Sequence, residues 1–110
     1  MDWLVRTSEL PWEPAPVEGV SWQLLQEVPQ GTIKRFRLQP GASYPVHHHP
    51  DRSEWVYTVV GTLTVTLGST VQELQPGDFA WIPVGLAHGL GNQTDEVVEF
   101  LVGAFSQVVS

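Results

Sequence analysis

The sequence contains no cysteine, which excludes disulfide bridges, cysteine-ligated zinc and thiol nucleophiles. Basic residues are scarce, since five Lys and Arg stand against twelve Asp and Glu and the formal net charge is −7. Three of the five bases lie in residues 34–37, a patch too small to attract a phosphate backbone, which argues against nucleic-acid binding. No apolar run reaches the length of a membrane span, and residues 1–9 show no leader-like pattern. These absences predict a soluble, cytoplasmic protein.

Long helices are also absent from the pattern, because no stretch keeps a 3.6-residue apolar period. Ten Gly and nine Pro instead separate short segments of alternating apolar and polar residues. Eight to ten short strands without intervening helices predict an all-β, antiparallel sandwich or barrel over residues 20–110. Residues 1–19 form a separate zone, in which Pro11, Pro14 and Pro16 forbid a helix. We expect an extended N-terminal arm there, with Trp3, Leu4, Leu10 and Trp12 buried against a sheet of its own chain or of a partner.

The stretch from Gly41 to Gly61 holds three of the four histidines and the carboxylate of Glu54. His47 and His49 are two residues apart and point to the same face of a strand, whereas His48 points to the other face. A four-residue turn then leads to Glu54, which opens an apolar β-branched run. Two imidazoles and a carboxylate brought together in this way are three ligands of a metal site.

Two complete motifs resemble those of the cupin superfamily. The first is matched by Gly41, His47, His49, Glu54 and Gly61. The second is matched by Gly77, Pro83, Gly85, His88 and Asn92. A short linker joins them, as in the small single-domain members, and the motifs span about half of the chain. The glycines are expected to permit tight or left-handed turns.

The resemblance implies a jelly-roll β-barrel in which His47, His49, Glu54 and His88 converge on one divalent metal. Three imidazoles and one carboxylate suit Mn, Fe(II), Ni, Cu or Zn. Four ligands leave open positions on a five- or six-coordinate ion, which suits catalysis or ligand capture. A less specific resemblance, over residues 10–20 and 38–50, is to the cupins related to the sensor half of zinc-dependent anti-sigma factors, a group that includes small β-diketone-cleaving dioxygenases.

Strand parity predicts which side chains line the pocket. If Glu54 faces inward, Val56, Thr58 and Val60 do so too. Further candidates near the metal are Phe36, Tyr44, Ala80, Ile82, Leu86 and Phe100. The cavity is therefore expected to be mostly apolar, with only Arg35 or Arg37 available as an anchoring charge. The outward stripe of Trp55, Tyr57 and Val59 is unusual for a monomer surface and predicts a homodimer.

These features favour a metal-dependent enzyme that acts on a small molecule, with dioxygenase-type cleavage of a diketone, enol or phenol as the preferred chemistry. Isomerisation or decarboxylation of a small carbonyl compound is an alternative on the same scaffold. A non-catalytic cupin that binds or senses a metal or small ligand is the other, because fold does not decide function.

Overall fold

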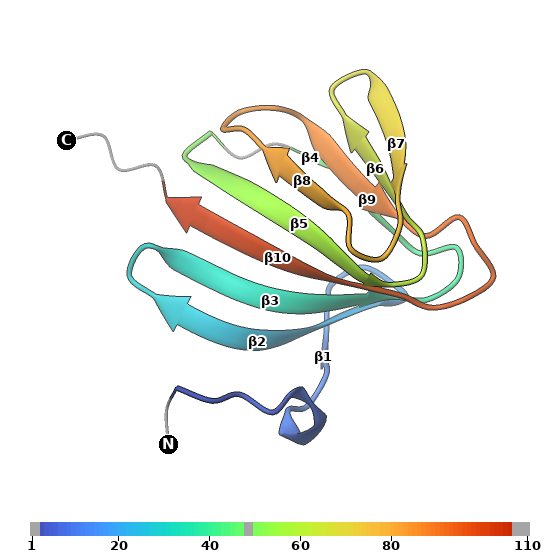
Figure 1. Ribbon diagram of the computed structural model, residues 1–110. Coiled ribbons are helices and arrows are strands. Elements are labelled where there is room, and N and C mark those ends of the chain that lie inside the picture. The colour runs from blue at the N-terminus through green and yellow to red at the C-terminus, as the bar shows by residue number, and fades with distance from the viewer. Residues whose placement is uncertain (1–2, 48–49, 107–110) are drawn as a thin grey trace.

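The computed structural model describes residues 3–47 and 50–106 (Figure 1). Within these ranges the chain forms one short 3-10 turn, η1, and strands β1 to β10. Their bounds are η1 Thr7–Glu9, β1 Glu13–Pro14, β2 Val20–Val28, β3 Gly31–Leu38, β4 Ser43–His47, β5 Arg52–Val60, β6 Leu63–Leu67, β7 Thr70–Leu74, β8 Phe79–Ile82, β9 His88–Gly91 and β10 Val98–Ser106. In these ranges no helix has the length and apolar character that crossing a membrane requires.

The strands form two antiparallel sheets, ordered β1-β2-β3-β10-β5-β8 and β4-β9-β6-β7. The prediction of an all-β antiparallel fold is therefore confirmed. Among the described residues no ladder joins the two sheets, so a closed barrel is not observed. The strand β8 ends the larger sheet after only four residues, because Pro83 follows it directly and cannot donate a backbone hydrogen bond.

The core lies between the two sheets. The larger sheet contributes Val56, Val98 and Phe100, and the smaller sheet contributes Leu63 and Val65. All five are at most 4% exposed. Burial of such side chains stabilises the fold by about 1.5–3 kcal/mol each relative to exposure. The sheets are thereby fixed face to face, with one open end that holds the site described below.

Glycine turns set the ends of the strands as expected, since the four motif glycines all have positive φ angles between 77° and 94°. Gly61, between β5 and β6, shows the constraint most clearly. A Cβ atom there would lie 2.8 Å from the carbonyl oxygen of Val97. Any other residue at this position would therefore meet both an unfavourable φ and a backbone clash.

A bulge in β5 changes the side-chain alternation near its end. Phe100 pairs with Thr58 and Glu99 pairs with Val60, so Val59 is the extra residue. The bulge reverses the side-chain parity beyond it. As a result Val60, which was predicted to face the interior, is 41% exposed.

The N-terminal segment lies on the outer face of its own large sheet. Gln23 is buried and donates hydrogen bonds to the carbonyl oxygens of Thr7 and Leu10, at 2.8 and 3.1 Å. The guanidinium of Arg37 lies 3.9 Å from the ring centroid of Trp12, which is half-buried. Trp3 and Leu4, which were expected to be buried, are exposed. Exchange of this segment between subunits stays a prediction.

Candidate metal centre

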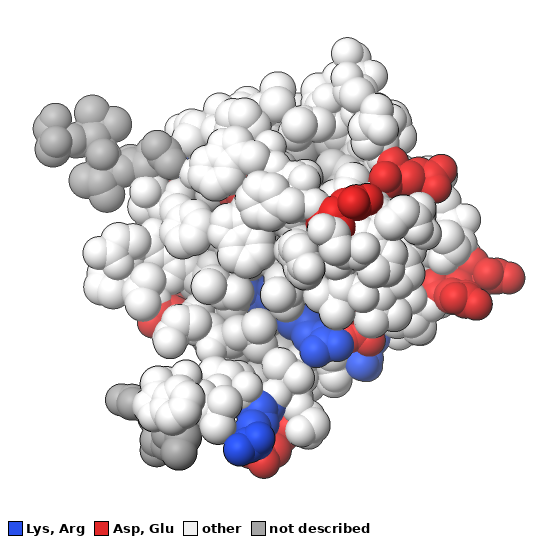
Figure 2. Space-filling view, in the orientation of Figure 1, with Lys and Arg blue, Asp and Glu red and all other residues white. Residues whose placement is uncertain are grey.

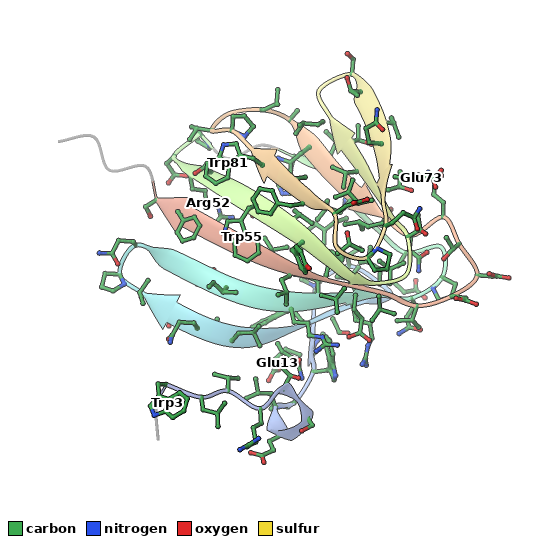
Figure 3. The ribbon with its side chains drawn as sticks, viewed as in Figure 1. Trp3, Glu13, Arg52, Trp55, Glu73 and Trp81 are labelled. Carbon is green, nitrogen blue, oxygen red and sulfur yellow. The ribbon has the colours of Figure 1, made fainter. Side chains whose placement is uncertain are left out.

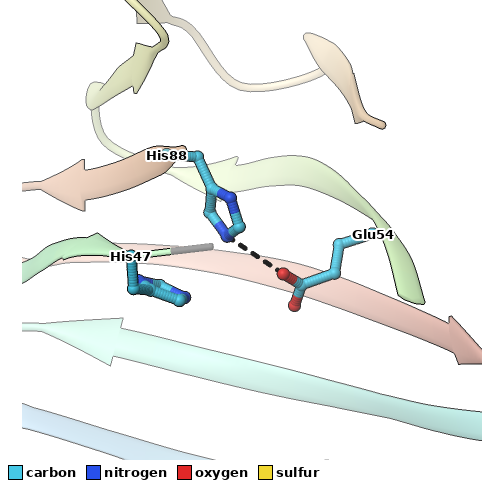
Figure 4. A group of neighbouring side chains, drawn as sticks. All are labelled: His47, Glu54 and His88. Carbon is cyan, nitrogen blue, oxygen red and sulfur yellow. Dashed lines mark ion pairs between the residues drawn. The ribbon is translucent and has the colours of Figure 1, made fainter. Parts of the chain in front are cut away.

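Three of the predicted ligands come together at one end of the space between the sheets (Figure 4). His47 ends β4 and His88 begins β9, and the two residues are paired across this ladder. Glu54 reaches them from β5 of the facing sheet. One ligand atom from each residue lies within 4.8 Å of the others. The predicted fourth ligand, His49, and its neighbour His48 lie outside the described residues.

Both imidazoles are oriented by the chain just before them. Nδ1 of His47 lies 2.8 Å from the carbonyl oxygen of Pro45, and Nδ1 of His88 lies 3.0 Å from that of Leu86. A carbonyl oxygen only accepts, so Nδ1 carries the proton in each ring. Each Nε2 therefore faces the centre, and this is the arrangement that orients metal-binding histidines in proteins.

Glu54 and His88 hold a proton where a cation would fit. Nε2 of His88 lies 3.0 Å from Oε1 of Glu54, and His88 is only 3% exposed. The hydrogen bond that the imidazole of His88 donates to the Glu54 carboxylate raises the pKa of His88, the Leu86 carbonyl acts in the same direction, and burial opposes both. Ligand atoms that share one proton are also placed to bind a divalent ion, which would displace that proton. The residues present thus fit a transition metal with mixed nitrogen and oxygen ligands.

The three residues line a cavity of about 210 Å³. Its other lining residues are Thr32, Lys34, Phe36, Tyr44, Arg52, Val56, Ile82, Leu90, Val102 and Ala104. An apolar cavity of about 150 Å³ is enough to admit benzene, so this volume suits a small organic molecule. Four of the predicted pocket residues, Phe36, Tyr44, Val56 and Ile82, are among those that line it.

The structure places four other predicted pocket residues elsewhere, and one of them, Ala80, lines a second hollow. Thr58 and Phe100 are fully buried, and Phe100 stacks behind Phe36 with ring centroids 5.5 Å apart, so both lie behind the cavity wall. Leu86 lies in the loop before β9, on this second hollow, which β6, β7 and β8 also line. The backbone of this loop turns back at Pro83, whose carbonyl accepts the Leu86 N–H at 3.3 Å. The Leu86 carbonyl faces Nδ1 of His88, while the Leu86 side chain lies on the second hollow.

Sequence reasoning missed the two cations of the cavity, Lys34 and Arg52. The candidates it offered, Arg35 and Arg37, point outward to Glu99, at 2.8 and 3.6 Å. Side-chain alternation could have predicted both residues, because Lys34 has the parity of Phe36 and Arg52 has the parity of Glu54. Figure 3 places Arg52 at the start of β5.

Asn92, the last residue of the second motif, has a structural role. It is buried, and its amide nitrogen donates to the carbonyl oxygens of Leu38 and Glu96, at 3.1 and 2.6 Å. These bonds fix the loop between β9 and β10 against β3. Asn92 therefore supports the frame of the site and does not line the cavity.

Comparison with known proteins agrees with this geometry. The Cupin domain family matches residues 34–103. A mannose-1-phosphate guanylyltransferase of Sinorhizobium fredii is 36% identical over 76 residues, which cover 66% of this chain and 15% of that protein. The oxalate decarboxylase OxdC of Bacillus subtilis is 30% identical over 69 residues, which cover 58% of this chain and 18% of that protein. The chain thus spans less than a fifth of the length of these two relatives.

A solved structure shares the whole fold. It is a predicted oxalate decarboxylase from Thermotoga maritima, with a TM-score of 0.89 and 23% identity, and the match covers 94% of this chain and 99% of that one. At this level of identity the likeness concerns the fold alone.

Proposed function

The chain belongs to the cupin family, and on that premise we propose that it is a metal-dependent enzyme acting on a small organic molecule. The observation that carries the proposal is the convergence of His47, Glu54 and His88 at the wall of a cavity of about 210 Å³. A closed structural metal site would have no such space beside its ligands. His49 is the proposed fourth ligand, and Fe, Mn, Ni, Cu or Zn is the proposed metal.

Different residues of the chain would have different roles in such a site. The bound metal would supply Lewis acidity or redox chemistry to a substrate at its open positions. His47 and His88 are held by the Pro45 and Leu86 carbonyls, so they need little reorganisation to bind the ion. Glu54 contributes negative charge, which lowers the net charge of the centre.

The apolar wall favours chemistry that needs water to be kept away. Phe36, Val56 and Ile82 line the cavity, and Val56 and Ile82 are at most 2% exposed. Oxidative cleavage of a diketone, enol or phenol by dioxygen is such a reaction, because water competes with the substrate. Dioxygenase-type cleavage is therefore our first candidate.

Decarboxylation of a small acid is the second candidate. It is supported by the 30% identity to the Bacillus oxalate decarboxylase and by the presence of Lys34 and Arg52 in the cavity wall. Cleavage by dioxygen consumes oxygen, whereas decarboxylation releases carbon dioxide. Measuring both gases therefore distinguishes the two candidates.

The test is metal analysis followed by turnover assays. The protein is reconstituted separately with Fe(II), Mn(II), Ni(II), Cu(II) and Zn(II), and oxygen uptake is recorded with β-diketones and catechols. Carbon dioxide release is recorded with small carboxylic acids. Glu54→Ala should abolish any activity found, and Glu96→Ala, an exposed carboxylate, is the matched control. Metal binding without either activity in any form would refute the enzyme proposal and leave a binding or sensing cupin.

We also propose that the protein is a homodimer. Trp55 pairs with Trp81 and Tyr57 pairs with Phe79 on the outer face of β5 and β8. Phe79 and Trp81 are 59% and 51% exposed. Figure 2 shows that this face consists largely of uncharged side chains. An aromatic, uncharged face of this kind supports association with a second copy.

A further inference from the structure

We propose that the substrate of this site carries a carboxylate, and that Arg52 and Lys34 bind it beside the metal ligands. The inference rests on the proposed function and adds the substrate class. The charged residues of the cavity differ in balance from those of the whole chain. The chain has twelve acids and five Lys and Arg, yet among the described residues the cavity wall contains two of those five bases and one acid, Glu54. With a divalent metal bound, the charged groups of this cavity sum to a positive value.

The strand register places the two cations at different distances from the ligands. Arg52 precedes Glu54 by two residues on the same face of β5, so their Cα atoms are roughly 7 Å apart. Lys34 pairs with Val102 and Glu54 pairs with Ala104, on opposite sides of β10. Lys34 and Glu54 are therefore separated by two strand spacings and by two residues along the strand direction, so their Cα atoms are roughly 12 Å apart. A small molecule with one end at the metal therefore has its other end within reach of both cations.

The remaining bases of the large sheet have other roles, which makes the contrast sharper. Arg35 and Arg37 lie on the outer face and pair with Glu99. Among the described residues no carboxylate lies within ion-pair distance of Lys34, and its ammonium rests 4.4 Å from the ring centroid of Trp22. A cation–π contact of this kind is weak compared with a carboxylate pair in an apolar cavity, so an incoming anion competes well for Lys34.

Carboxylate fits the site better than phosphate does. A guanidinium binds a carboxylate through two parallel hydrogen bonds and balances its single charge, and the ammonium of Lys34 adds a second attraction. A helix N-terminus, or a glycine-rich loop that opens a helix, is a common site for phosphate. In residues 3–47 and 50–106 the one helical turn is η1, three residues long, on the outer face of the sheet. The apolar neighbours Val56 and Val102 further strengthen the attraction by lowering the local dielectric constant.

The experiment uses probes that share one metal-binding end. Succinic acid monohydroxamate carries a carboxylate tail, and its primary amide carries a neutral tail of the same shape. A phosphonate-tailed hydroxamate is the third probe. Dissociation constants are measured by calorimetry on the metal-reconstituted protein, on Arg52→Met, on Lys34→Met and on the control Arg6→Met, which removes an exposed charge outside the cavity. Metal content is measured in every sample.

We expect the wild type to bind the carboxylate probe at least tenfold more tightly than the amide. Arg52→Met and Lys34→Met should each reduce this preference by roughly tenfold, the usual effect of losing a hydrogen bond to a charged group, and Arg6→Met should leave it unchanged. Equal affinity for the carboxylate and amide probes, an undiminished preference in both cavity variants, or tighter binding of the phosphonate would overturn the inference while leaving the proposed function intact. Absence of metal uptake would overturn the proposed function, and the inference with it.

Discussion

Replacement of His88 by Ala tests the metal centre and the energetics of its metal-free state together. The variant loses one of the proposed ligands, so we expect metal affinity to fall by more than the 10- to 100-fold that is typical of changes next to a ligand. The fold should persist, because His88 does not belong to the apolar core cluster that includes Val56, Leu63 and Phe100.

The cost to the metal-free protein follows from the local contacts. The imidazole is 3% exposed, and its Nε2 lies 3.0 Å from Oε1 of Glu54, whose side chain is 12% exposed. A hydrogen bond to a charged group contributes about 1.5–3 kcal/mol. The ring already lines an open cavity, so its removal enlarges that cavity and does not create a new one in the core, and the additional packing penalty is small. We therefore expect a loss of about 2–3 kcal/mol, or about 8–15 °C in Tm for a domain of this size.

Thermal unfolding with and without metal measures both effects. A ligand at 100 times its dissociation constant stabilises the folded state by about 2.7 kcal/mol, so the wild-type Tm should rise on metal addition. His88→Ala should show a lower starting Tm and no comparable rise. Metal content and a metal-induced increase equal to those of the wild type would refute the assignment of His88 as a ligand. A collapsed circular dichroism spectrum would instead show that the fold depends on this side chain, contrary to our reasoning.

Three further predictions concern pH, packing and association. Because the pKa of His88 is raised above its ordinary value of 6.5, its ion pair stabilises the metal-free protein fully below that pH and less as the pH rises through the raised pKa; urea unfolding should show this decline in the wild type, and an equal decline in His88→Ala would contradict it. Gly103→Ala should cost about 1–3 kcal/mol, since the new Cβ would lie 2.2 Å from Nε1 of Trp55, and tryptophan fluorescence with chemical unfolding checks it. Sedimentation should find a wild-type dimer that Trp81→Glu converts to a monomer and that Val71→Glu, a change at an exposed residue of β7, does not; a 12.2 kDa wild-type monomer would exclude the dimer.

Much of the fold follows from patterns that need no knowledge of the partner strand. The glycines between the short apolar runs mark the turns, and alternation along β5 places Glu54 and Val56 inward and Tyr57 outward, as the structure shows. The resemblance of the two motifs to those of cupins brought His47, Glu54 and His88 together in the prediction. Local sequence rules are strong here because each strand is short and bounded by turn residues.

What could not be predicted depends on register and on neighbouring strands. The bulge at Val59 exists only relative to β10, so alternation alone carried Val60 to the wrong face. Phe100 faces the interior as parity requires, yet Phe36 covers it, and depth behind a wall cannot be inferred from one strand. Lys34 has the same parity as Phe36 and lines the cavity, but the prediction offered its neighbours Arg35 and Arg37, which have the opposite parity, as the anchoring charge.

The central position of β10 has a consequence for how the cavity could change during evolution. Its inward residues Val102 and Ala104 are small and lie between the longer side chains of β3 and β5, where Lys34 and Glu54 originate. The strand β10 therefore sets the size of the cavity, while β3 and β5 set its charge and its ligands. Size and chemistry are adjustable through separate residues, so a descendant of this chain could accept a smaller or larger molecule by a single change on β10 and keep its metal centre untouched.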